Sequence, residues 1–278
     1  MAYSAEISRT NPSCFVFVID QSGSMSDSFP DGSKTKAAGV SDAINKLLQE
    51  LVIRCAKEEG VRDYFHIGVI GYGAMVGSAF GGALAGKKLV TVSEIANSPA
   101  RIEERIKKID DGAGGLVDQK VRFPIWFDPS SANGTPMCKA LDDAKSVLQG
   151  FLAQHPNCFP PVVIHITDGE STDGDPTESM RALTALSSND GNVLLFNLHL
   201  SSNPNAKSTA FPSDSNSLPD QFAQLLFNNA SQLTPFMRST AGQHGFNLSE
   251  GARCFVLNAD LVLVVQALDI GTRPSNLR

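Results

Sequence analysis

Short runs of consecutive apolar residues predict buried strands along the chain. The run at 15–19 reads Phe-Val-Phe-Val-Ile, which is too short for an ordinary helix and lacks the alternation of a half-exposed strand. Further strands are predicted at 64–70, 161–166, 193–200 and 254–257. We therefore expect a central, mostly parallel sheet in which the strand at 15–19 is buried on both faces.

Between these runs, apolar residues that recur every three or four positions predict amphipathic helices. The first should follow the polar loop at 21–34, span about 25 residues and end with Gly60 as its C-terminal cap. A second is predicted at 99–109, and a third begins with Thr135 as N-cap and Pro136 at its first position. The remaining helices are expected at 175–186, at 218–228, up to about 240 and from about 260 onward.

Strand and helix alternate with connections too short for a linker, which favours one doubly wound, Rossmann-like α/β domain. It would span 1–278, with 1–12 as an N-terminal extension. The glycine-rich segment 71–86 is typical of turns and a hairpin, and a short strand is expected near 88–90. The segment 110–132 is the least regular part of the chain, and no element is predicted there.

Composition and charge narrow the functional classes. The 278 residues are 42% hydrophobic and 19% charged, as in soluble globular proteins. A net charge of −6 argues against nucleic acid or an anionic membrane as the main partner, since both favour a basic surface.

The chain start lacks the charged and then apolar pattern of a secretory signal, and no stretch approaches the ~20 apolar residues of a membrane span. We therefore expect a cytoplasmic protein. The cysteines are odd in number, widely spaced and mostly in apolar segments, which predicts free buried thiols at positions 14, 55, 138, 158 and 254.

Oxygen-bearing side chains occur where predicted strands end and where one helix begins. The strand at 15–19 leads into Asp20-x-Ser22-x-Ser24, the strand at 161–166 leads into Asp168, and Thr135 opens a helix. Ligands of open α/β sheets bind beyond the carboxyl ends of the strands, so these side chains are expected to converge. Hard oxygen ligands without a lysine or glycine-rich phosphate cradle suit a small hard cation such as Mg²⁺.

This combination resembles the metal-ion-dependent adhesion site (MIDAS) of von Willebrand factor type A (vWA) domains. Val-Ile-Asp-Gln-Ser-Gly-Ser-Met, Gly-Thr-Pro-Met and Ile-Thr-Asp-Gly occur in the family's order, and the resemblance covers nearly the whole chain. It implies that Ser22, Ser24 and Thr135 donate hydroxyl oxygens to Mg²⁺ or Mn²⁺, while Asp20 and Asp168 hold metal-bound waters. It also implies the vWA fold.

By the same resemblance the protein is a metal-dependent protein-interaction module. The partner should supply an Asp or Glu side chain to the cation, because a site with few charged ligands leaves the metal attractive to a carboxylate. The chain looks like bacterial cytosolic single-domain members that work beside a kinase, phosphatase or ATPase in stress or defence systems; this setting is inferred by analogy.

Structural and enzymatic alternatives remain open at this point. Thr135 alone could simply cap its helix, and each aspartate alone could cap a turn. A phosphatase of the haloacid dehalogenase type would use Asp20 as nucleophile, but it needs a second acid where this chain has Ser22. We identify no catalytic base and expect no enzymatic activity. The histidines at 66, 165 and 199 lie in predicted strands and are expected to be hydrogen-bonded core residues.

Overall fold

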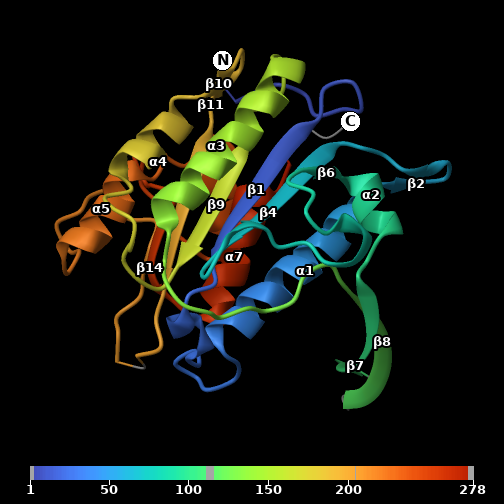
Figure 1. Ribbon diagram of the computed structural model, residues 1–278, viewed down its shortest axis with the longest axis horizontal. Helices are drawn as coiled ribbons and strands as arrows, with labels where there is room; N and C mark the ends of the chain where they lie inside the picture. The colour runs from blue at the N-terminus through green and yellow to red at the C-terminus, as the bar shows by residue number, and fades with distance from the viewer. Residues whose placement is uncertain (1–2, 111–115, 204, 275–278) are drawn as a thin grey trace.

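The computed structural model describes residues 3–110, 116–203 and 205–274 (Figure 1). An eight-stranded sheet lies at its centre, in the order β13-β14-β12-β9-β1-β4-β5, with β6 as a further partner of β4. Its five longer strands pair in parallel and confirm the predicted ones: β1 (Ser13–Asp20), β4 (Phe65–Tyr72), β9 (Val162–Thr167), β12 (Leu194–Leu200) and β14 (Phe255–Ala259). Three short antiparallel strands complete the sheet: β5 (Val76–Ser78), β6 (Val90–Thr91) and β13 (Thr209–Ala210).

Helices cover both faces of the sheet, as a doubly wound fold requires, and Figure 1 shows α3 on one side of the strands and α1 and α7 on the other. One hydrophobic cluster joins the sheet to α1 (Lys36–Cys55), α2 (Val92–Asn97), α6 (Pro235–Gln243) and α7 (Leu261–Thr272). The other joins it to α3 (Met137–Gln154), α4 (Thr177–Thr184) and α5 (Gln221–Asn229). The predicted α/β class and mostly parallel sheet are confirmed.

Strand β1 shows why a run of consecutive apolar residues is needed at the centre of such a sheet. Phe15 and Phe17 belong to the first hydrophobic cluster, whereas Val16 and Val18 belong to the second. Successive side chains of a strand point to opposite faces, so every position here meets a hydrophobic core. The run ends at Asp20, where the chain leaves the sheet.

The helix predicted at 99–109 is wrong, because this segment is strand β7 (Arg101–Asp110). It pairs with β8 (Leu116–Ile125) in an antiparallel ribbon that projects from the body (Figure 1). The expectation of an irregular stretch at 110–132 is therefore wrong over 116–125, and its residues 111–115 lie outside the described part of the chain. A spacing of four fits one face of a strand as well as one face of a helix. Ile102 and Ile106 are 47% and 68% exposed, so no core selected the helical alternative.

Two predicted helix ends also differ from the structure. Helix α1 ends at Cys55, and Gly60 lies instead in a small hairpin of β2 (Ala56–Lys57) and β3 (Gly60–Val61), where its φ of 123° suits a residue without a side chain. Helix α3 begins at Met137 with Pro136 at the N-cap, so Thr135 is not its cap. The remaining hairpin comprises β10 (Ser187–Ser188) and β11 (Gly191–Asn192).

The five cysteines are free, as predicted. Four of them are buried, but the prediction of a buried thiol is wrong for Cys138, which is partly exposed. Burial raises the pKa of Cys55 and of Cys158 to about 12, so these thiols are protonated and unreactive. Among the described residues, no helix combines the length and the apolar character needed to cross a bilayer.

Candidate metal centre

The oxygen-bearing residues singled out above, Asp20, Ser22, Ser24, Thr135 and Asp168, are called the candidate centre below. Asp20 is the last residue of β1, and Ser24 lies in the short 3-10 helix (Gly23–Ser26) that follows. Asp168 comes directly after β9, the parallel neighbour of β1. The strand ends therefore meet at one edge of the sheet, which places both aspartates there.

Hydrogen bonds link four of the five residues. The backbone N–H of Ser22 donates to Asp20 Oδ1 at 2.8 Å. The hydroxyl oxygens of Ser22 and Ser24 lie 3.1 Å apart, and the Ser24 hydroxyl donates to Asp168 Oδ1 at 2.8 Å. The hydroxyl of Thr167 donates to Asp20 Oδ2 at 2.9 Å, so β9 holds the carboxylate of β1 in place.

Thr135 is tied to the same region through its backbone. Its N–H donates to the Thr172 hydroxyl at 2.9 Å, and the Thr172 N–H donates to the Thr135 carbonyl at 2.9 Å. Nearby, Ala132 N–H donates to the Gln21 carbonyl at 2.7 Å. Gly73 permits this meeting of loops, because a Cβ there would lie 2.4 Å from the Gln21 oxygen and 2.7 Å from the Ala132 oxygen.

The start of α3 is capped by a residue that sequence reasoning left out. Both carboxylate oxygens of Asp173 accept backbone N–H groups of the first turn, from Cys138 and Lys139, each at 3.0 Å. An aspartate there also complements the helix dipole. The structural explanation of Thr135 as the cap of this helix is therefore wrong. No pattern in the sequence places the 169–173 loop against α3.

Charge at the candidate centre is concentrated on two buried carboxylates. Asp20 is fully buried, and its pKa is raised by that burial and further by the nearby charge of Asp168. Lys36, which sequence reasoning also missed, lies with its Nζ 2.5 Å from Asp168 Oδ2. Their relative geometry is not that of a hydrogen bond, because Asp168 Oδ2 is a buried atom without a hydrogen-bond partner among the described residues.

These observations fit a hard divalent cation. The centre offers only oxygen atoms, the buried Asp168 Oδ2 has the Lys36 ammonium group beside it but no hydrogen-bond donor among the described residues, and the exposed Ser24 opens the cluster to solvent. Over the described ranges, no three His, Cys, Asp or Glu side chains gather as a metal site would require, so hydroxyl groups would have to supply much of the coordination. Such a donor set suits Mg²⁺ or Mn²⁺ and would bind it weakly.

A buried polar network lies under the centre. Tyr72, which pairs with Asp20 across β4 and β1, has its hydroxyl 2.7 Å from His165 Nε2, and His165 Nδ1 lies 2.9 Å from Asn197 Oδ1. Burial lowers the pKa of His165 to about 4, which keeps the ring neutral. The prediction of a hydrogen-bonded core histidine is confirmed at His165, and His199 accepts a longer hydrogen bond from the Asn258 N–H at 3.4 Å.

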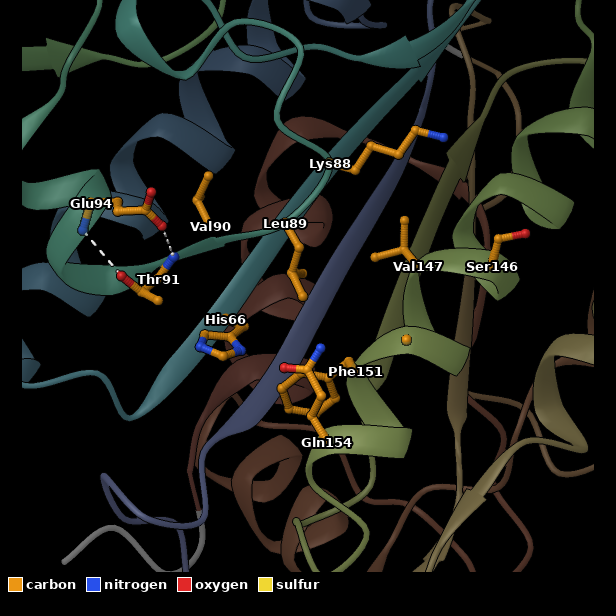
Figure 2. A pocket seen from close by; sticks show the side chains of 11 residues that line it. His66, Lys88, Leu89, Val90, Thr91, Glu94, Ser146, Val147, Phe151 and Gln154 are labelled. Atoms are coloured by element: carbon orange, nitrogen blue, oxygen red, sulfur yellow. Dashed lines mark hydrogen bonds between the residues drawn. The ribbon is translucent and has the colours of Figure 1, made fainter.

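For His66 the same prediction is wrong. Its Nδ1 is buried without a hydrogen-bond partner in the described part of the chain, and its ring lines a pocket of about 370 Å³ between β6 and α3. Figure 2 shows the ring beside Phe151 and Gln154, with Glu94 and Thr91 hydrogen-bonded to each other on the far wall. His66 is the second residue of β4, so this pocket is separate from the candidate centre at the carboxyl ends of the strands.

No protein-family model and no curated protein sequence matches the chain. Among solved structures, the pilus adhesin SpaC of Lactobacillus rhamnosus GG is similar at 14% identity and a TM-score of 0.48, over 96% of this chain and 31% of that one. Manganese-loaded TRAP of Plasmodium vivax is similar at 16% identity and a TM-score of 0.44, over 96% and 76%.

The ArnB paralog VWA2 of Sulfolobus acidocaldarius is similar at 13% identity and a TM-score of 0.37, over 69% of this chain. This chain thus spans only 36% of the length of the Sulfolobus protein. Similarity of this degree concerns the course of the backbone and does not extend to what the proteins bind.

Proposed function

We propose that this protein is a vWA-type interaction module that binds a partner carboxylate through a Mg²⁺ or Mn²⁺ site. The observation that carries the proposal is the continuous chain of contacts from Ser22 through Ser24 to Asp168, beside the buried Asp20. Two buried carboxylates close together repel each other, so each makes it less favourable for the other to ionise. A cation beside them relieves this repulsion.

Each residue of the candidate centre would have a distinct role in binding the cation. Ser22, Ser24 and Thr135 would hold the metal by their hydroxyl oxygens. Asp20 and Asp168 would hold waters that are bound to the cation, and their negative charges would offset part of its charge. Thr167 and the Ser22 N–H hold Asp20 in one rotamer, which pre-organises the site. When bound, the cation supplies a concentrated positive charge on a protein of net charge −6, and an Asp or Glu of the partner is the ligand that suits it.

The expected biological setting is part of the same proposal. As the resemblance in its motifs implies, the chain would belong to the bacterial cytoplasmic vWA proteins that act beside a kinase, phosphatase or ATPase in stress or defence systems. Its acidic charge favours a protein partner over nucleic acid or membrane.

Metal binding is tested by titrating Mn²⁺ into the protein in a calorimeter. Ser24→Ala should weaken binding at least about tenfold, which corresponds to about 1.4 kcal/mol, because it removes one ligand from an exposed position where the fold does not depend on it. Ser26→Ala is the matched control, since Ser26 is exposed in the same turn and its hydroxyl donates only to the Gly23 carbonyl. Equal binding by both variants, or no binding by the parent at millimolar Mn²⁺, would contradict the proposal.

The module is proposed to have no enzymatic activity. The alternative, a phosphatase of the haloacid dehalogenase type, requires an acid at position 22, where the Ser22 hydroxyl instead contacts Ser24. With added Mg²⁺ the protein should hydrolyse neither p-nitrophenyl phosphate nor ATP. Turnover by the parent that disappears in Asp20→Asn would establish the phosphatase instead.

A further inference from the structure

Lys36 holds a position that the stability of its own helix does not explain. It is the first residue of α1, directly after the N-cap Thr35. A lysine at this end of a helix opposes the helix dipole, which favours anions there. Its side chain is only 4% exposed, and burying an ammonium group is unfavourable unless an anion compensates it.

The anion that compensates Lys36 is the carboxylate of Asp168 in the candidate centre. Lys36 Nζ lies 2.5 Å from Oδ2 of Asp168, whose side chain is fully buried, whereas Asp27 is 58% exposed and its Oδ2 lies 3.8 Å away. Lys34 provides a contrast two residues earlier, because it pairs with Asp42 at the surface and its side chain is 43% exposed. Among the described residues, Lys36 is the only one that forms an ion pair with a carboxylate of the candidate centre.

We propose that Lys36 sets the charge of the metal centre so that the loaded site demands an anionic partner; this inference rests on the function proposed above. Asp20 and Asp168 contribute two negative charges and Lys36 one positive charge. A divalent cation therefore brings the centre to a net charge of +1, and a carboxylate from a partner restores neutrality. Without Lys36, the cation alone would neutralise the centre, and an arriving carboxylate would add an uncompensated charge.

Two opposite effects follow from this charge balance. Lys36 repels a divalent cation held by the same carboxylates, so it weakens binding of the metal alone. It also strengthens the affinity of the loaded centre for a carboxylate. Lys36→Met should therefore bind Mn²⁺ about tenfold more tightly than the parent, while acetate should bind the Mn²⁺-loaded variant more weakly than it binds the loaded parent.

The experiment compares the parent protein with Lys36→Met, Lys36→Arg and Lys34→Met. Mn²⁺ affinity is measured by calorimetry, and acetate binding by its effect on the water-proton relaxation of bound Mn²⁺. Lys36→Arg keeps the charge and Lys34→Met removes an exposed one, so both should resemble the parent in both measurements. Thermal unfolding of each variant is followed with and without Mn²⁺, and the metal should stabilise Lys36→Met more than it stabilises the parent, because it replaces the lost ammonium charge.

The outcomes distinguish the two proposals. If neither the parent nor any variant binds Mn²⁺, the proposed function fails. If the parent binds Mn²⁺ but Lys36→Met matches it in metal affinity, in acetate affinity and in stabilisation by the metal, the role of Lys36 is overturned and the function stands. If Lys36→Met is unfolded without metal, Mn²⁺ during refolding should restore its circular dichroism spectrum, and failure to do so also overturns the role of Lys36.

Discussion

His165 makes the protein sensitive to acid from within its core. It is fully buried between Tyr72 and Asn197, directly beneath the end of β1, and both ring nitrogens have a partner there. Protonation would place a charge in this network, and the pKa of the ring is accordingly lowered to about 4. The unfolded chain binds that proton near pH 6.5, so the folded state loses stability as the pH falls between these two values.

We therefore predict that the free energy of unfolding falls by roughly 3 kcal/mol between pH 7 and pH 4 through His165 alone. Well above pH 6.5 both states hold a neutral ring, and the contribution of His165 is constant. Urea denaturation across this range, compared between the parent and His165→Gln, measures it, because the variant is less stable at neutral pH but should lack this part of the slope. Parallel pH profiles for the two proteins would rule out the assignment.

Asn45 connects helix α1 to the segment that follows the β7–β8 ribbon. It is fully buried, its Oδ1 accepts the backbone N–H of Trp126 at 2.8 Å, and its Nδ2 donates to the Phe127 carbonyl at 3.0 Å. The Phe127 carbonyl also accepts the Ser41 hydroxyl at 3.1 Å, so that acceptor keeps a partner without Asn45. The backbone N–H of Trp126 would lose its acceptor, since it has no other one among the described residues, whereas the indole N–H donates to the Ile95 carbonyl.

Asn45→Ala should consequently lower the free energy of unfolding by about 2–4 kcal/mol, through an unpaired buried donor and a small cavity. Trp126 is the only tryptophan of the chain, so its fluorescence reports directly on this junction during urea unfolding. Lys46→Ala, at the exposed neighbouring position, should change stability by no more than about 0.5 kcal/mol. A similar small effect in both variants would show that the junction does not depend on Asn45.

The ribbon itself shows where prediction from sequence failed. The long parallel strands were predictable because burial on both faces demands consecutive apolar residues, as in β1. The segment 101–110 has no such constraint, because Ile102 and Ile106 face solvent and its partner strand lies beyond the sheet. Its pairing with 116–125 depends on a partner strand that local periodicity cannot reveal. The cap of α3 was predicted wrongly for a similar reason. It is Asp173, which lies 35 residues downstream of Cys138 and so cannot be recognised from the local sequence.

The arrangement of the candidate centre was predictable in part. Topology alone brings the ends of β1 and β9 together, and with them Asp20, Ser22, Ser24 and Asp168; their role as metal ligands stays a prediction. Lys36 was not found, because an isolated lysine near a helix start resembles any solvated residue until the fold buries it. The one available signal was its unfavourable place at the helix N-terminus.

The net charge of −6 governs how the protein as a whole should meet its partner. An acidic partner surface would be repelled by the protein unless the metal supplies a local positive charge. We predict that immobilised protein captures such a partner from a lysate of the source cells in Mg²⁺, loses it in chelator and recovers it when Mg²⁺ returns. Thr135→Ala should weaken capture without unfolding α3, because Asp173 caps that helix. Capture indifferent to both chelator and Thr135→Ala would mean that recognition uses another face, even if Mn²⁺ binds at the centre.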